Sequence, residues 1–129
     1  MIGIKAAFSG LSVNDIDKAK EFYTQTLGLT LQDDAMGLHL KLPNGGTLFI
    51  YAKEDHTPAA FTVLNFVVDN IDTAVDELTE QGVHFERYDN MPMPQDKKGI
   101  ARGRMVNQGP DIAWFKDPAG NILSVLQDK

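Results

Sequence analysis

Apolar and polar positions follow a pattern that begins with a strand and continues as a helix. Residues 4–12 are mostly apolar and predict a strand. The apolar residues that follow recur every three or four positions, which predicts a helix with one apolar face; they are Ile16, Ala19, Phe22, Tyr23 and Leu27. Asp15 suits the N-cap of this helix, and Gly28 suits the position just after its end.

Three further strands are expected in this half of the chain. Leu29 and Leu31 begin the first. In the second, leucines at positions 38, 40 and 42 alternate with His39 and Lys41, which is typical of a half-buried strand. Asn44-Gly45 indicates a type I′ hairpin turn, and residues 48–51 form the return strand. The order of elements is therefore βαβββ.

The same order is expected again after a polar segment at residues 54–60. Residues 61–68 predict a strand, and Asn70 suits the N-cap of a helix that ends at Gly82. The apolar face of this helix is Ile71, Ala74, Val75 and Leu78, and the next strand is expected to begin with Val83 and Phe85.

A long loop and a final hairpin complete the second half. Residues 88–99 show no periodicity, and loops of that length are usually functional or disordered. Residues 112–116 and 122–126 predict two strands, and the Pro and Gly between them indicate a tight turn at 117–121.

One short motif occurs in both halves. Val13-Asn14-Asp15-Ile16-Asp17-Lys18-Ala19 is matched by Val68-Asp69-Asn70-Ile71-Asp72-Thr73-Ala74. Two copies are too few for a solenoid, so we interpret them as a pair of packed units. The prediction is an α+β fold of two βαβββ modules in one domain, with module 1 at about residues 1–53, a linker at about 54–60 and module 2 at about 61–129.

In these motifs the chain resembles the glyoxalase/bleomycin-resistance/extradiol-dioxygenase superfamily, also called vicinal oxygen chelate (VOC) proteins. The resemblance rests on residues 13–15, Phe22-Tyr23 and Leu27-Gly28, then on residues 68–72, Gly82-Val83 and 115–121. It implies a curled mixed sheet around a cavity, helices on the outside and a homodimer.

Metal-dependent members of that superfamily hold a metal with two histidines and two glutamates. By resemblance, three of those positions are Phe8, Val63 and Ser124, and the fourth is either Phe49 or Tyr51. Apolar side chains cannot coordinate a divalent cation, and a lone hydroxyl is a poor ligand. We therefore expect no metal and no other cofactor at these positions, which weakens a lyase or dioxygenase assignment.

The three histidines provide few other metal candidates. His39 faces either the cavity or solvent. His84 and Glu86 lie on one strand face and could hold a metal, although Val83 and Phe85 take the buried face, which leaves the pair in solvent. His56 belongs to the polar linker.

Period-two alternation assigns the residues of the cavity. We expect a mostly aromatic and apolar ligand-binding lining, of a kind that suits flat or cationic molecules; it consists of Phe8, Phe49, Tyr51, Val63, Asn65, Trp114 and Ser124. Tyr51, Asn65 and Ser124 would orient the ligand. The alternative is a barrel that its own side chains fill.

Two features near the long loop have open interpretations. Met91 and Met93 suit an adaptable lid, or else the loop packs on a dimer partner. Arg102 and Arg104 alternate on a possible short strand, where they could pair with an anionic ligand or lie on the surface.

Composition narrows the range of functions. The formal charge of −6 argues against a nucleic-acid partner, and no apolar run is long enough to span a membrane. The chain has no cysteine and no signal-peptide pattern at its start, which fits a cytoplasmic location.

The sequence favours a small-molecule binding protein without the usual metal centre, which would sequester a drug or metabolite. One alternative is a metal-dependent enzyme, a glyoxalase I-like lyase or a dioxygenase, with a non-standard metal site. Another is a dimeric scaffold with a filled barrel.

Overall fold

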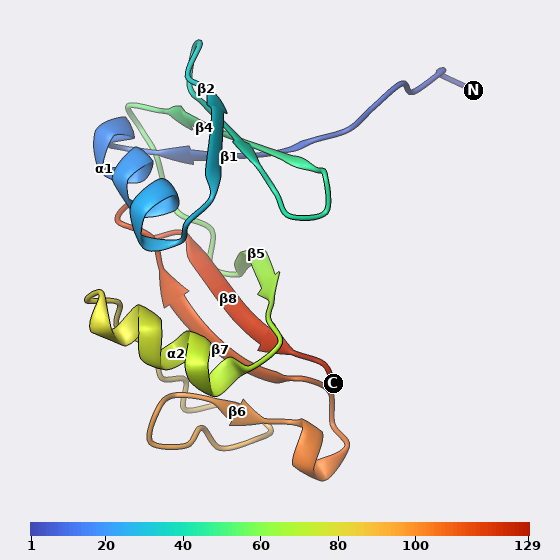
Figure 1. Ribbon diagram of the computed structural model, residues 1–129, viewed down its shortest axis with the longest axis vertical. Helices are drawn as coiled ribbons and strands as arrows, with labels where there is room; N and C mark the ends of the chain where they lie inside the picture. Colours follow the sequence, from blue (N-terminus) through green and yellow to red (C-terminus); the bar gives the residue numbers. More distant parts are fainter. The chain divides into compact units, whose positions relative to one another are not determined.

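The computed structural model describes all residues of the chain, 1–129, and divides into two compact units, Met1–Pro58 and Ala59–Lys129. Each unit contains one four-stranded mixed sheet and one α-helix (Figure 1). The predicted α+β class and the two βαβββ halves are confirmed. No helix is both long enough and apolar enough to cross a membrane.

The elements of the first unit, in chain order, are β1 (Ser9–Val13), α1 (Ile16–Glu21), the π-helical turn η1 (Phe22–Thr26), β2 (Thr30–Asp33), β3 (Leu38–Lys41) and β4 (Thr47–Ala52). The order of strands in the sheet is β1-β4-β3-β2. β1 pairs with β4 in parallel, and the other pairs are antiparallel.

The ends of the first helix are where the sequence places them. The side chain of Asp15 accepts a hydrogen bond from the backbone N–H of Lys18 at 3.1 Å, which satisfies one of the free donors of the first turn. Gly28 has a φ of 73°, a conformation that glycine adopts at little cost, and it ends the segment.

Two local predictions in the first unit are wrong. β1 begins at Ser9 and not at residue 4, because residues 1–8 have no strand partner and are exposed. The hairpin turn is not type I′, which needs positive φ at both central residues. Only Gly45 has positive φ, and its N–H donates to the carbonyl of Leu42, so Pro43 and Asn44 are the central residues. Proline favours this arrangement because its ring fixes a negative φ.

The elements of the second unit are β5 (Thr62–Val67), α2 (Ile71–Glu80), β6 (Ala101–Arg102), the short 3-10 helix η2 (Arg104–Val106), β7 (Asp111–Lys116) and β8 (Ile122–Gln127). The order of strands is β5-β8-β7-β6, the counterpart of the first sheet. The side chain of Asn70 caps α2 by accepting from the N–H of Thr73 at 3.0 Å, as predicted.

The strand expected at Val83 and Phe85 does not form. Phe85 makes a single bridge to Phe115, and the strand β6 lies further along the chain, where Ala101 pairs with Ile112. The outer edge of β7 is therefore paired by two short segments, and residues 86–100 between them contain the long loop predicted at 88–99. In the first unit a single strand, β2, pairs with the corresponding edge of β3, and this is the main difference between the two units.

Each sheet buries one face against its own helix, since α1 contacts β4 and α2 contacts β7 and β8 (Figure 1). Buried residues alternate along the strands, which is the period expected when one face is packed. In the first unit they include Leu38, Leu40, Leu48 and Ile50, and in the second Ala113, Phe115, Leu123 and Val125.

Candidate ligand-binding site

A row of three side chains crosses the second sheet on the face opposite α2. In the strand register Asn65 on β5 pairs with Ser124 on β8, and Ser124 pairs with Trp114 on β7. Paired residues point to the same face of a sheet. The row therefore brings together three of the seven side chains that the sequence assigns to the site.

Each member of this row has a defined polar contact. The hydroxyl of Ser124, which is fully buried, donates to Oδ1 of Asn65. The indole N–H of Trp114 donates to the hydroxyl of Thr62 at 3.1 Å. Because its oxygen is occupied, the Asn65 amide leaves its N–H donors for other partners. Ser124 thus positions Asn65 and has little access to a ligand itself.

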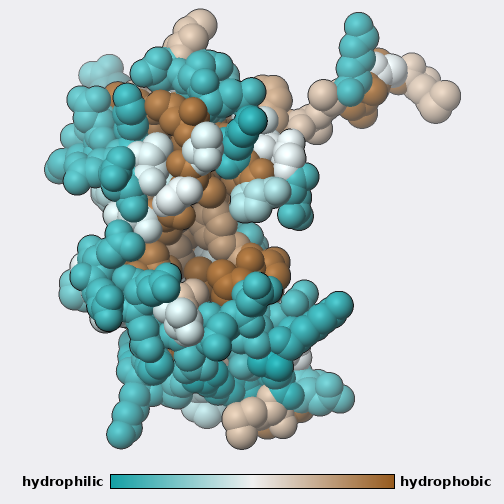
Figure 2. Space-filling model, in the orientation of Figure 1, coloured by the Kyte–Doolittle hydropathy of each residue, from teal (hydrophilic) through white to brown (hydrophobic).

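Trp114 forms one wall of a cavity of about 210 Å³ that is lined by Ala60, Phe61, Thr62, Tyr88, Met91, Trp114 and Ile122. The Tyr88 ring meets the Trp114 ring edge to face, with centroids 5.5 Å apart and planes at 78°. Burial raises the pKa of the Tyr88 hydroxyl above its usual value. Around β5 hydrophobic side chains gather at the surface, whereas the surface over α2 is hydrophilic (Figure 2); Phe61 is 68% exposed.

Thr62 is a site residue that the sequence pattern does not identify. The β5–β8 register shifts between Thr62 and Leu64, so two residues of β5 span one step of β8. As a result Thr62 pairs with Ile122 and reaches Trp114, although uninterrupted alternation from Asn65 would place Thr62 on the other face. Val63 lies within the irregularity and does not line the cavity.

The first sheet carries a related row on its own face opposite α1. Gly10 pairs with Phe49, and Phe49 pairs with His39. The Phe49 ring lies 4.7 Å from the His39 ring and stacks on Tyr51 at 5.7 Å between centroids. Tyr51 is 37% exposed, so this aromatic stack is accessible from solvent.

The two rows occupy corresponding places in the two sheets. Gly10 lies five residues before its N-cap Asp15, as Asn65 lies five before Asn70. Phe49 is paired with Gly10 as Ser124 is paired with Asn65. Phe49, rather than Tyr51, is therefore the counterpart of Ser124.

The residues at the positions expected to hold a metal do not fit a divalent cation. Phe8, Phe49 and Val63 have no donor atom, and the Ser124 hydroxyl donates to Asn65. Phe8 also lies before β1 and is 69% exposed. In the whole chain no three His, Cys, Asp or Glu side chains are grouped so that they could bind a metal.

His56 has a more definite environment than a polar linker predicts. Its Nδ1 lies 2.6 Å from the hydroxyl of Ser12 on β1, and the Lys53 N–H donates to the carbonyl of Val13. These bonds hold residues 53–56 against the first sheet.

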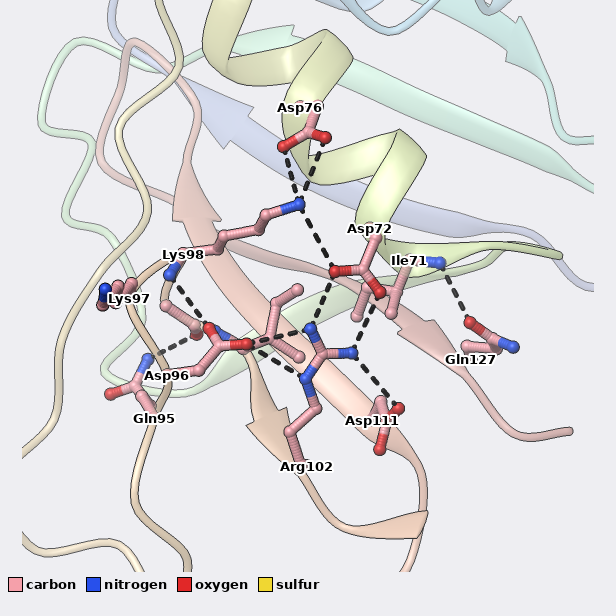
Figure 3. A network of polar contacts seen from close by, with 12 residues as sticks. Ile71, Asp72, Asp76, Gln95, Asp96, Lys97, Lys98, Arg102, Asp111 and Gln127 are labelled. Atoms are coloured by element: carbon pink, nitrogen blue, oxygen red, sulfur yellow. Dashed lines mark hydrogen bonds and ion pairs between the residues drawn. The ribbon is translucent and has the colours of Figure 1, made fainter. Parts of the chain in front are cut away.

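The loop at residues 86–100 is fixed to α2 by a network of charges (Figure 3). Arg102 binds both carboxylate oxygens of Asp72, at 2.7 and 3.0 Å, and donates from Nε to Asp96 at 3.0 Å. Lys98 joins Asp72 to Asp76. The Arg102 hydrogen bond lowers the pKa of Asp72 to about 2 against the opposing effect of burial.

Asp111 connects this network to the other arginine. Its carboxylate, only 6% exposed, lies 3.6 Å from both Arg102 and Arg104. Carboxylates of the same unit thus balance the charge of each arginine. Neither arginine is therefore a favoured contact for an anionic ligand.

Comparisons with known proteins agree with this fold. No curated protein matches the sequence. Three solved structures of similar fold are TnmS3, an antibiotic binding protein from Streptomyces sp. CB03234 (24% identity, TM-score 0.67, all of both chains), a glyoxalase family protein from Enterococcus faecalis (21%, 0.68, 98% of this chain and 99% of that one) and a glyoxalase/dioxygenase from Nostoc punctiforme (17%, 0.71, 97% and 91%). Identities this low show likeness of fold alone.

A family model matches residues 5–125, nearly the whole chain. With both βαβββ units in place, the protein belongs to the glyoxalase/bleomycin resistance protein/dioxygenase superfamily.

Proposed function

We propose that this protein binds flat, uncharged small molecules in the cavity beside Trp114, without a metal, and so sequesters them. The observation that carries the proposal is the cavity itself. Its lining contains three aromatic rings, from Phe61, Tyr88 and Trp114, and no carboxylate, ammonium or guanidinium group.

The chemistry of this lining favours one class of ligand. Aromatic rings gain from stacking or edge contact with a planar ring system. An anionic group would lose its hydration without gaining an ion pair, which is costly. A cationic group would gain only contacts with ring faces, since no carboxylate lines the cavity. A volume of about 210 Å³ is smaller than the ~300 Å³ or more typical of drug-sized sites, so the cavity suits one fused ring system and leaves any larger substituent outside.

Asn65 and Ser124 do not line the cavity, but they lie beside Trp114 and would give direction to the part of a ligand that extends beyond it. The Asn65 amide donors lie on the same sheet face as Trp114, and the Ser124 hydroxyl fixes the orientation of that amide. They suit a carbonyl or similar acceptor on the ligand. TnmS3, a protein of similar fold, is described as an antibiotic binding protein, which supports a binding role for this fold.

The chain also supplies a lid for this cavity. Gln95 closes the base of the loop, because its amide donates to the carbonyls of Glu86 and Gly99 and accepts from the N–H of Tyr88. Tyr88 and Met91, just inside this closure, reach the cavity. Methionine adapts to ligands of different shape, so Met91 would cover the bound ring.

Trp114 is the only tryptophan in the chain and therefore reports on this cavity directly. The experiment is a fluorescence titration with acridone, a neutral planar probe, with free N-acetyltryptophanamide as the optical control. We expect saturable quenching with a Kd on the order of 1–100 µM, or about 5–8 kcal/mol of binding free energy. Anthraquinone-2-sulfonate, an anionic planar probe, should bind at least about tenfold more weakly.

A matched pair of variants locates the site. Phe61→Ala removes a ring that lines the cavity and should weaken acridone binding about tenfold. Val67→Ala removes a side chain of similar exposure, 66%, that lies outside the cavity, and should leave binding unchanged. Unchanged binding in Phe61→Ala, or no saturable quenching in the wild type, would show that the cavity is not the binding site.

A further inference from the structure

A second cavity, of about 340 Å³, lies on the opposite side of the second unit from the Trp114 row, between α2 and the two ends of the long loop. Its polar lining residues are Asp76, Thr79, His84, Arg87, Lys97 and Lys98. This groove shares no residue with the Trp114 cavity.

The groove collects positive charge that the protein itself does not balance. Asp76 is its only carboxylate, and Lys98 lies 3.0 Å from that carboxylate and also pairs with Asp72 (Figure 3). Arg87 and Lys97 take part in no ion pair. Half of the twelve lysines and arginines are unpaired in this way, and two of these, Arg87 and Lys97, line this one groove together.

Arg87 is also held in place before any ligand arrives. Its two terminal nitrogens donate to the backbone carbonyls of Asp96, at 2.6 Å, and Lys97. These contacts fix the guanidinium without neutralising it, and they leave other donors of the planar group free. A preorganised guanidinium suits the oxygens of a phosphate group, which it can bind through two parallel hydrogen bonds.

We propose that this groove is a binding site for a small phosphate-bearing ligand, with Arg87 and Lys97 as its charged contacts and the Thr79 hydroxyl and His84 imidazole as further hydrogen-bonding groups. The site is independent of the proposed function of the Trp114 cavity. A bound dianion would balance the charges of these two cations locally.

The probe for this site is inorganic phosphate at neutral pH, with sodium chloride used to keep the ionic strength constant. A ligand that binds only the folded protein raises its unfolding temperature in a saturable manner. We expect that rise in the wild type. Lys97→Glu should weaken phosphate binding at least about tenfold, and Lys97→Arg should keep it.

Lys41→Glu is the matched control. Lys41 is an exposed, unpaired lysine on β3 of the first unit, so its replacement makes the same charge reversal away from the groove. Phosphate binding in this variant should stay within about twofold of the wild type. The proposal is overturned if phosphate raises the unfolding temperature of the wild type no more than chloride does, because phosphate then has no specific site. It is also overturned if Lys41→Glu and Lys97→Glu weaken binding equally, because binding then depends only on the net charge.

Discussion

Gly37 sets the position of the Phe49 ring in the first sheet. It has a φ of 146°, and a Cβ added there would lie 2.6 Å from the carbonyl oxygen of Ile50 and 2.7 Å from the ring of Phe49. The neighbouring backbone atom cannot move freely, so a side chain at this position must displace the ring or the strand. The stack of Phe49 on Tyr51 therefore depends on a glycine that contributes no contact of its own.

Gly37→Ala should lower the free energy of unfolding by at least about 2 kcal/mol, because it combines backbone strain with a steric clash. Urea denaturation measures the loss. Gly46→Ala is the control, since a Cβ there would meet only the Leu42 side chain at 3.7 Å. If the two variants were equally stable, the close approach at Gly37 would not be rigid.

Thr62 has a comparable role in the second sheet, where its hydroxyl accepts from the Trp114 indole. Thr62→Val removes this acceptor at almost constant volume. We expect a loss of about 1 kcal/mol in stability and a changed Trp114 emission spectrum, because the ring is no longer held by its N–H. Thr30→Val, on an exposed strand position, should change neither quantity. Identical emission in wild type and Thr62→Val would contradict the assigned hydrogen bond.

At the scale of elements, the loop at residues 86–100 replaces a continuous edge strand, and charges hold it in place. Arg102 is the centre of that arrangement because it contacts three carboxylates from three elements, those of Asp72, Asp96 and Asp111. Its side chain is 28% exposed, so these contacts are only partly screened by water. Lys116 and Glu86, in contrast, form a single longer pair at 3.5 Å.

Arg102→Met should lower the free energy of unfolding by about 3 kcal/mol, because it leaves Asp111 and Asp96 with fewer positive partners in a partly buried position. Lys116→Met removes one ion pair from the surface and should cost less than about 1 kcal/mol. Chemical denaturation compares the two variants. Equal losses would mean that the Arg102 network is no stronger than a surface pair.

The same network predicts how stability depends on pH. The pKa of Asp72 is about 2 in the folded protein and 3.8 for a free side chain, so its ionised form stabilises the fold. That contribution is complete above about pH 4 and is lost as the pH falls towards 2. Solvent exposure of the side chain limits it to about 1 kcal/mol. Asp72→Asn should make stability less dependent on pH between 4 and 2. A variant with the same pH dependence as the wild type would rule out this assignment.

Local sequence signals predict the elements that carry their own patterns. The predicted N-caps at Asp15 and Asn70 are confirmed, because a short polar side chain directly before an apolar helical face accepts a hydrogen bond from the first turn. The alternation at Val83 and Phe85 is that of a normal strand, so the sequence does not show that only Phe85 forms a bridge, to Phe115, while residues 101–102 pair with the other end of β7. No residue type indicates the register shift in β5, so alternation alone places Thr62 on the face away from Trp114.

At the scale of the whole molecule, one supersecondary unit is used twice with different side chains at matching places. Phe49 and Ser124 occupy corresponding positions, as do His39 and Trp114, yet one row is an aromatic stack and the other a hydrogen-bonded row. The exchange of residues leaves no donor set for a metal and gives the second unit an aromatic cavity. Three expectations from the sequence stay predictions. They are a single cavity enclosed by the curled sheet, a homodimer, and contact of Phe8 and Val63 with a ligand.

The most direct measurement is a calorimetric titration of acridone into protein that has been stripped of metals with a chelator and then freed of the chelator. Our account predicts saturable binding at one site per chain, with the same affinity after manganese, iron, nickel or zinc is added back. If the stripped protein released no binding heat and one of those metals restored it, the protein would depend on a metal and the proposed function would be wrong.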